Sequence, residues 1–189
     1  MRVTFSKLPG RRYRVGIERE HGPRLEPRNG PGYDEQLPHD LAHYVVEEQL
    51  GIRLGVFGQL AAGGAGLFAP APADRRGRDR RAAHRFATAG RDDMRRSEAT
   101  VGVCVAEWRR RTGIGDGGPI AEVDIQLPPA DVERVVRRLE ELSQAWRALD
   151  AGESLTLQWP RATVVDPAGS RSGRRTERAR RARRHPADS

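Results

Sequence analysis

Alternating hydrophobic and polar residues mark two parts of this chain. Residues 2–6 and 13–20 alternate in this way, with Leu8–Arg11 between them as a turn, and residues 154–159 alternate again. A period of two is typical of half-buried β-strands. The pattern predicts that the chain opens with a β-hairpin and adds a further strand after residue 153.

Three other segments have the spacing of amphipathic helices. The first, 37–50, ends at Gly51, and the second begins at an aspartate near residue 92 and runs to about 111. The third, 131–149, is opened by a Pro-Pro-Ala-Asp sequence and has the most regular apolar face. We therefore expect three helices between the hairpin and the last strand.

The remaining segments favour short strands and loops. We expect residues 56–61 and 66–68 to be two short strands around a glycine-rich turn, and 122–126 to be another. Residues 22–32 are rich in glycine and proline, which predicts a loop.

These elements predict an α+β fold, in which a small antiparallel sheet is packed by about three helices. The sheet would contain the N-terminal hairpin and the C-terminal strand. We expect one domain over residues 1–165, with a Gly/Pro/Arg-rich linker near 69–85. Residues 166–189 have no core-forming pattern and predict a disordered, Arg-rich tail.

The helix at 37–50 carries the most specific chemical pattern. His39, His43 and Glu47 are each four residues apart, so their side chains lie on neighbouring turns of one helical face. Imidazole and carboxylate groups are zinc ligands. The spacing predicts a divalent-metal site, with zinc as the metal and hydrolysis as one use of it. Asp40 would orient a histidine from behind.

Residues 39–43 resemble the His-Glu-x-x-His motif of zinc metalloproteases. Asp40 stands where that motif has its general-base glutamate, and its side chain is one methylene shorter. The resemblance covers five residues and by itself assigns no catalytic role.

A structural role for the same residues stays open. Pro38 is favoured at the first helical position, which puts Asp40 in the first turn, where a carboxylate stabilises the helix dipole. If Asp40 were the N-cap instead, His39 would fall outside the helix and the spacing would be lost. Histidines at the edge of an apolar face also often bond to the backbone. Further ligands, if the fold brings them near, would be His21, Asp34 and His84.

The net charge of +8 is distributed unevenly. The positive excess lies in residues 74–96 and 171–189, while the rest of the chain is slightly acidic. Arginine clusters can neutralise phosphates, so the alternative function is a non-enzymatic interaction protein that binds nucleic acid or another polyanion without sequence preference. A solvated charge run is the competing interpretation. The clusters comprise Arg75, Arg76, Arg78, Arg80 and Arg81, and Arg174, Arg175, Arg178, Arg180, Arg181, Arg183 and Arg184.

The residue inventory excludes several kinds of chemistry. Lys7 is the single lysine, so a Walker A loop and a buried Schiff-base lysine are not available. The glycine-rich run 63–66 lacks that lysine and favours a turn over a phosphate site. Cys104 cannot form an internal disulfide and falls on an apolar helix face, which indicates a core residue.

Composition also suggests a setting for the protein. Arginine greatly outnumbers lysine, and alanine, glycine and proline are abundant, which suggests a high-GC bacterial genome. The uncharged stretch 54–73 contains too many glycines and prolines for a membrane span. With one cysteine and no leader pattern, we expect a cytoplasmic protein without a membrane partner.

Overall fold

The structure is a computed structural model, and it describes residues 1–30, 34–74, 84–86, 88–114 and 125–161. Its strands are β1 (Arg2–Leu8), β2 (Arg12–Glu18), β3 (Arg28–Asn29) and β4 (Ser154–Gln158). Its helices are α1 (His39–Leu50), α2 (Val56–Ala61), α4 (Arg91–Thr112) and α5 (Pro129–Arg147), with a 3₁₀ turn η1 (Pro72–Asp74).

The four strands form one antiparallel sheet in the order β3-β2-β1-β4. The predicted hairpin is confirmed: β1 and β2 pair along their whole length, and the turn between them uses positive φ angles at Gly10 and Arg11. The last strand joins the sheet at β1, with Thr156 opposite Thr4. The predicted α+β fold is therefore confirmed.

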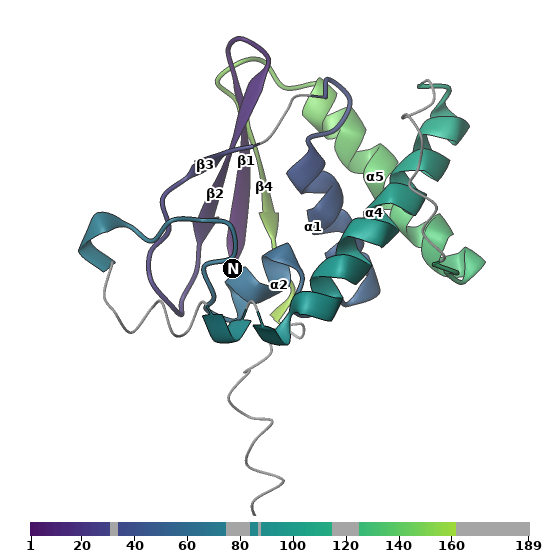
Figure 1. Cartoon of the computed structure of the whole chain (residues 1–189). Helices are drawn as coiled ribbons and strands as arrows, with labels where there is room; N and C mark the ends of the chain where they lie inside the picture. Colours follow the sequence, from purple (N-terminus) through teal and green to yellow (C-terminus); the bar gives the residue numbers. More distant parts are fainter. Residues whose placement is uncertain (31–33, 75–83, 87, 115–124, 162–189) are drawn as a thin grey trace, which may run out of the picture.

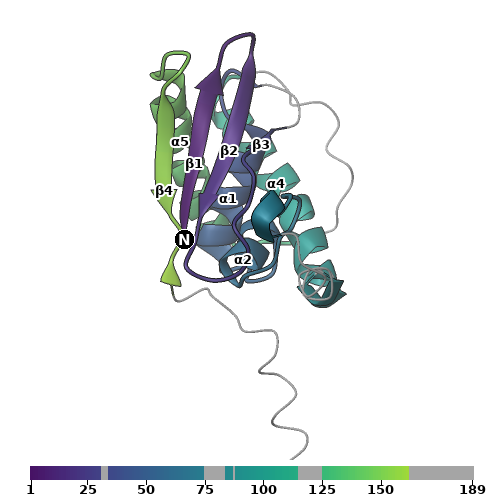
Figure 2. The same ribbon diagram turned by 90° about the vertical axis from the view of Figure 1, so that its left-hand side faces the viewer.

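Helices α1, α2, α4 and α5 all lie on one face of the sheet (Figures 1 and 2). The side chains that alternate toward this face, among them Val3, Phe5 and Val15, are fully buried. The opposite face is polar, with Thr4 hydrogen-bonded to Thr156 and Ser6 to Ser154. One-sided burial explains the alternation in the sequence.

Helix α1 is the central helix, because it contacts α2, α4 and α5 and its rings pack on the sheet (Figure 1). Every residue from Asp40 to Glu47 is buried. Tyr44 lies at the middle of an aromatic cluster, with ring centroids 5.3–6.2 Å from those of its neighbours. Those neighbours are Phe5, Phe57 and Trp159. Burial on several sides means that polar residues of α1 must find partners inside the protein.

Lys7 ties the sheet to the end of α5. Its Nζ donates to the carbonyl oxygens of Leu149 at 2.7 Å and Trp146 at 3.3 Å, and lies 5.6 Å from the centroid of the Trp146 ring. A cation at a helix C-terminus satisfies free carbonyls and interacts favourably with the helix dipole.

Some predicted elements differ from those observed. Residues 56–61 form helix α2 and not a strand, since a short apolar run does not distinguish the two by its period. Residues 66–68 form a turn, and the predicted loop 22–32 contains β3. Of the strand predicted at 122–126, residues 125–126 are not in a strand and the rest lie outside the described residues.

The three long helices begin and end within a few residues of their predicted bounds. The tail 166–189 and most of the linker near 69–85 lie outside the described residues, so their predicted organisation stays a prediction. Among the described helices, none is long and apolar enough to cross a membrane.

Candidate metal centre

The two histidines of α1 face each other at the start of the helix. Pro38 is the N-cap and His39 is the first helical residue, so His39 and His43 lie on adjacent turns. Their Nε2 atoms are 3.1 Å apart, and their rings meet edge to face with centroids 4.7 Å apart. The alternative in which Asp40 is the N-cap is therefore wrong.

The third member of this group is Glu98, which comes from α4. Its Oε2 lies 3.5 Å from Nε2 of His43. One ligand atom from each of His39, His43 and Glu98 lies within 4.8 Å of the others. Helix α4 runs beside α1, so the group joins residues more than fifty positions apart (Figure 1). We call His39, His43 and Glu98 the outer cluster.

Glu47, which the sequence predicts as the third ligand, lies elsewhere. It is fully buried, and its carboxylate accepts hydrogen bonds from the backbone N–H groups of Val56, Phe57 and Gly58 at 2.7, 2.8 and 3.3 Å. These are the first N–H groups of α2, which has no side-chain cap of its own. Glu47, on α1, therefore caps the N-terminus of α2. The third member of the cluster is Glu98, in the place that the sequence predicts for Glu47.

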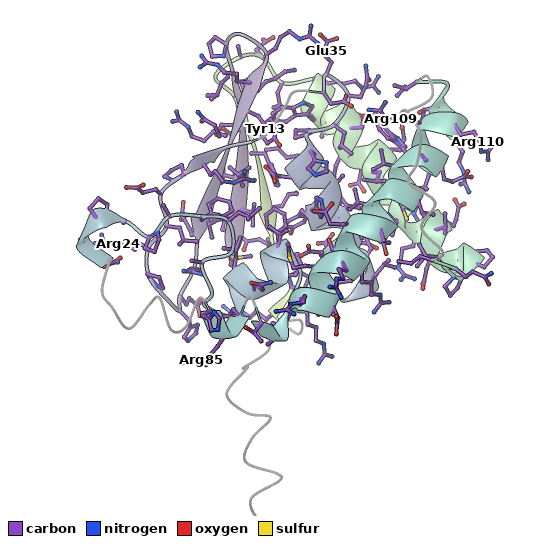
Figure 3. The ribbon with its side chains drawn as sticks, in the orientation of Figure 1. Tyr13, Arg24, Glu35, Arg85, Arg109 and Arg110 are labelled. Carbon is purple, nitrogen blue, oxygen red and sulfur yellow. The ribbon has the colours of Figure 1, made fainter. Side chains whose placement is uncertain are left out.

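Asp40 also has other partners than those predicted. Its Oδ2 accepts from the Tyr13 hydroxyl at 3.0 Å, and its Oδ1 accepts from the Arg28 guanidinium at 2.7 Å. One residue along a helix turns the side chain by about 100°, which directs Asp40 away from His39 and toward the sheet. Tyr13 reaches it from β2, where its side chain lies between the sheet and the helices (Figure 3). Asp40 thus ties α1 to the sheet and does not orient a histidine.

Ser97 connects the buried and exposed sides of this region. Its Oγ donates to Oε1 of Glu47 at 2.8 Å and lies 2.9 Å from Nδ1 of His43. A serine hydroxyl has one hydrogen, and Ser97 uses it in the hydrogen bond that it donates to the Glu47 carboxylate. Ser97 therefore accepts the Nδ1–H of His43. In neutral His43 this assignment leaves Nε2 unprotonated, with its lone pair directed into the outer cluster.

Electrostatics differ between the buried and exposed groups. Burial raises the pKa of Glu47, while the hydrogen bonds from Ser97 and from the N–H groups of Val56 and Phe57 oppose this rise. The hydrogen bond with His43 lowers the pKa of Glu98, and the charges of both histidines lower it further. Desolvation, followed by the charge of His43, lowers the pKa of His39. The lowered pKa of His39 favours the neutral imidazole that a metal requires. The lowered pKa of Glu98 depends on histidines that carry a proton, so it describes the metal-free cluster.

The distances in the outer cluster fit a small divalent cation. Zn–N bonds of about 2.0–2.1 Å at tetrahedral angles separate ligand atoms by about 3.3 Å. Two of the three separations bracket this value, with 3.1 Å between the histidines and 3.5 Å between His43 and Glu98, and all three ligand atoms lie within 4.8 Å of one another. The Glu98 side chain is 61% exposed and that of His43 only 3%, so the cluster has a buried inner side and an open outer side.

Other residues that the sequence offers as ligands lie apart from the cluster. Asp34 accepts a hydrogen bond from Arg109 and another from the backbone of Gln36. Neither His21 nor His84 belongs to a metal-sized group in the described part of the chain. The extra ligand comes instead from α4.

Backbone groups of the glycine-rich run 63–66 form hydrogen bonds with other parts of the protein. The N–H groups of Gly63 and Gly64 donate to carbonyls at the end of α2. The carbonyls of Leu60 and Gly64 accept from the Arg19 guanidinium, whose burial lowers its pKa to about 10. The run ends a helix and binds an arginine.

Cys104 is fully buried on α4, and desolvation raises the pKa of its thiol to about 11. This agrees with the predicted core position and gives a poor nucleophile at neutral pH.

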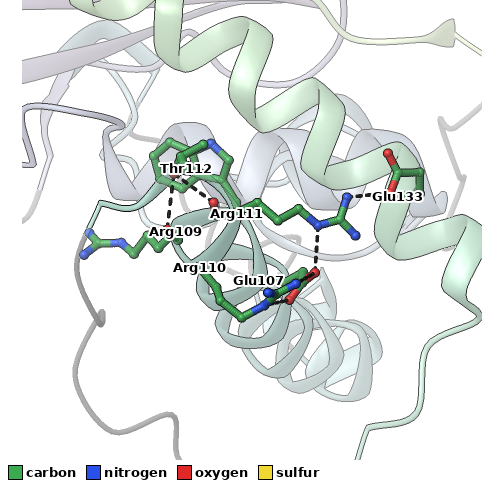
Figure 4. A network of polar contacts seen from close by, with 7 residues as sticks. Glu107, Arg109, Arg110, Arg111, Thr112 and Glu133 are labelled. Carbon is green, nitrogen blue, oxygen red and sulfur yellow. Dashed lines mark hydrogen bonds and ion pairs between the residues drawn. The ribbon is translucent and has the colours of Figure 1, made fainter.

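The arginine clusters at 75–81 and 174–184 lie outside the described residues, so polyanion binding by them stays a prediction from sequence. Arginines at the end of α4 do have partners. Arg110 and Arg111 bind Glu107 at 2.7–2.8 Å, and Arg111 also reaches Glu133 on α5 (Figure 4). Hydrogen bonds from these two arginines lower the pKa of Glu107 to about 2. Among these contacts, the one between Arg111 and Glu133 joins α4 to α5.

Comparison with known proteins adds no assignment: no family model, curated protein or solved structure matches the chain.

Sequence reasoning missed Ser97 and Glu98. Neither has a distinctive spacing from the histidines, since both lie on α4 whereas the histidines lie on α1. One signal was available: Ser97 lies on the apolar face of the predicted second helix, in line with Val101 and Cys104. A serine on a buried face requires a partner inside the protein.

Proposed function

We propose that this protein binds a divalent metal ion, zinc by preference, through His39, His43 and Glu98. The observation that carries the proposal is the convergence of three ligand atoms within 4.8 Å at an open surface. Two imidazoles and one carboxylate form a ligand set typical of zinc sites that keep a free coordination position. Ser97 supports it from behind by holding the Nδ1–H of His43.

The open outer side suggests the use of such a metal. A zinc ion held by three protein ligands carries a water in its fourth position and lowers the pKa of that water. Hydrolysis is the reaction class that this chemistry serves, and we propose it as the activity. The residues of this chain supply binding and orientation: His43 is held from the buried side, while His39 and Glu98 complete the set at the surface.

The decisive experiment is zinc binding by the full chain. Protein purified without chelators or added metal is analysed for its metal content, and metal-free protein is titrated with zinc against a chromophoric chelator. We expect one zinc per chain. His43→Ala and Glu98→Gln should each weaken binding by more than about 100-fold, since each removes a direct ligand.

A matched control is His21→Ala, which removes an exposed histidine outside the cluster and should leave zinc affinity unchanged. Circular dichroism establishes that each variant is folded. Folded wild-type protein that binds no zinc, or equal affinity in the wild type and Glu98→Gln, would overturn the proposal. Hydrolysis of p-nitrophenyl acetate, faster in the zinc-loaded wild type than in zinc-treated Glu98→Gln, tests the activity.

A further inference from the structure

A pocket lies between α2 and the first turns of α4, separate from the ligand atoms of the outer cluster. Its volume is about 330 Å³, near the lower end of the roughly 300–1,000 Å³ typical of small-molecule sites. The walls come from α2, from the turn that follows it and from α4. The lining residues are Val56, Gln59, Gly66, Leu67, Arg91, Met94 and Arg95.

Most of the exposed lining is apolar. Val56 and Met94 contribute side chains from two helices, and Leu67 lies at the pocket with 61% of its surface exposed. Leu67 is the one large hydrophobic residue classed as exposed in the described ranges. An apolar surface left open beside a pocket is typical of a ligand-binding site.

The charged residues of the lining are both positive. Arg91 and Arg95 lie one turn apart at the start of α4, where the free N–H groups of the helix add to the positive potential. Arginine at a helix N-terminus is unfavourable for the helix itself. Arg95 lies 3.5 Å from exposed Asp92, and the Arg95 side chain is 75% exposed. The charge at this pocket is thus available to a ligand.

We propose that this pocket binds a small amphipathic anion, with its apolar body between Val56, Leu67 and Met94 and its carboxylate on Arg91 and Arg95. Paired guanidinium groups recognise a carboxylate through charge-assisted hydrogen bonds. The apolar walls favour an aliphatic or aromatic body over a sugar or a nucleotide.

The pocket lies next to the outer cluster along α4. Arg91, Met94, Arg95 and Glu98 fall within an arc of about 100° on this helix, and Glu98 is one turn beyond Met94 and Arg95. Glu98 does not line the pocket, but a ligand held there would lie within about one helical turn of it. This makes an amphipathic carboxylate the substrate class of the metal site, a step that rests on the proposed function.

The test uses octanoate as probe and the full chain, metal-free and zinc-loaded, with binding followed by calorimetry. We expect saturable binding in the low-millimolar range or tighter, and 1-octanol, which has the same chain without the charge, should bind at least about tenfold more weakly. The double variant Arg91→Glu/Arg95→Glu should weaken octanoate binding at least about tenfold relative to the wild type. Met94→Trp, which fills the pocket, should abolish it. Arg137→Glu, an exposed arginine on α5, is the matched control and should bind like the wild type.

Outcomes separate the pocket from the metal site. No saturable binding to the folded wild type, or unchanged octanoate affinity in folded Met94→Trp, would overturn the pocket. Equal octanoate affinity in the double arginine variant would overturn the role of the two arginines. Equal affinity for octanol would overturn the anionic ligand. Affinity that differs between the zinc-loaded and metal-free forms supports the link to the cluster, and equal affinities would overturn that link alone. Octanoate binding by a protein that fails to bind zinc would mark failure of the proposed function and not of the pocket.

Discussion

Glu47 and Glu98 occupy the two ends of one path of polar contacts through Ser97 and His43, and they differ in almost every respect. Glu47 is fully buried and accepts four hydrogen bonds, three of them from the backbone of α2. Glu98 is largely exposed, and its contact with His43 lies at the surface. The oxygens of the buried carboxylate are used in hydrogen bonds that hold the fold together, whereas the exposed carboxylate can still coordinate a ligand.

This difference shows why helical spacing alone misassigns a ligand. Spacing of four residues places His39, His43 and Glu47 on one side of α1, but that side meets solvent at one end and α2 at the other. A carboxylate inside the protein requires donors, and the free N–H groups of α2 supply them. The role of each carboxylate follows from what packs against it.

The largest expected effect is on the buried side. Glu47→Gln removes the charge that three backbone N–H groups share and places an amide N–H₂ group against them. We expect the free energy of unfolding to fall by about 3 kcal/mol, since hydrogen bonds to a charged group contribute about 1.5–3 kcal/mol each and a buried donor left unsatisfied costs about 1–3 kcal/mol. Equilibrium urea unfolding measures it. A loss below about 1 kcal/mol would contradict the capping role.

A second change disturbs the Glu47 side chain without substituting Glu47 itself. A Cβ added at Gly55 would lie 2.3 Å from the Glu47 carboxyl carbon, so Gly55→Ala must displace that group. We expect a loss of about 1–3 kcal/mol in unfolding free energy, as for other overpacked sites. Gly16→Ala is the control, because the nearest neighbour of its added Cβ would be Thr4 O at 3.9 Å, an ordinary contact. Equal stability of the two variants would argue against close packing around Glu47.

Ser97→Ala cuts the path between the two carboxylates. The buried side loses one hydrogen bond, which should cost about 1–2 kcal/mol in urea unfolding. On the exposed side, His43 loses the acceptor that holds its Nδ1–H, so zinc affinity should fall by about 10–100-fold. Ser143→Ala, an equally buried serine on α5, serves as the control for zinc affinity. Unchanged zinc affinity in Ser97→Ala would show that the two sides are independent.

The smallest effect on stability is expected at Glu98. Glu98→Gln in metal-free protein should change the free energy of unfolding by no more than about 0.5 kcal/mol, as is usual for exposed positions. The same variant should lose zinc binding. A large loss of stability without metal would place Glu98 with Glu47 among the structural residues, and the contrast between them would fail.

The sequence predicted the fold better than the site. Alternation in β1, β2 and β4 and helical spacing in α4 and α5 arise from one-sided burial, which a single chain displays directly. Helix α1 is buried on several sides, so the spacing of its polar residues does not show which of them reach solvent. The spacing correctly predicts that His39 and His43 lie together. It does not predict that Glu47 binds the N-terminus of α2 or that Asp40 binds Tyr13 and Arg28. Glu98 and Ser97 enter through the packing of α4 on α1, and periodicity in one segment carries no information on such a contact.

The position of Lys7 has a practical consequence for chemical labelling. Amine-directed reagents find one lysine side chain in this sequence, and its Nζ is engaged by the carbonyls that end α5. Acylation of that amine removes its charge and competes with its hydrogen bonds to those carbonyls, so the rate of acylation reports how often the amine leaves the end of α5. The acylation rate of Lys7 in the unmutated protein thus measures local opening of the contact between β1 and the end of α5.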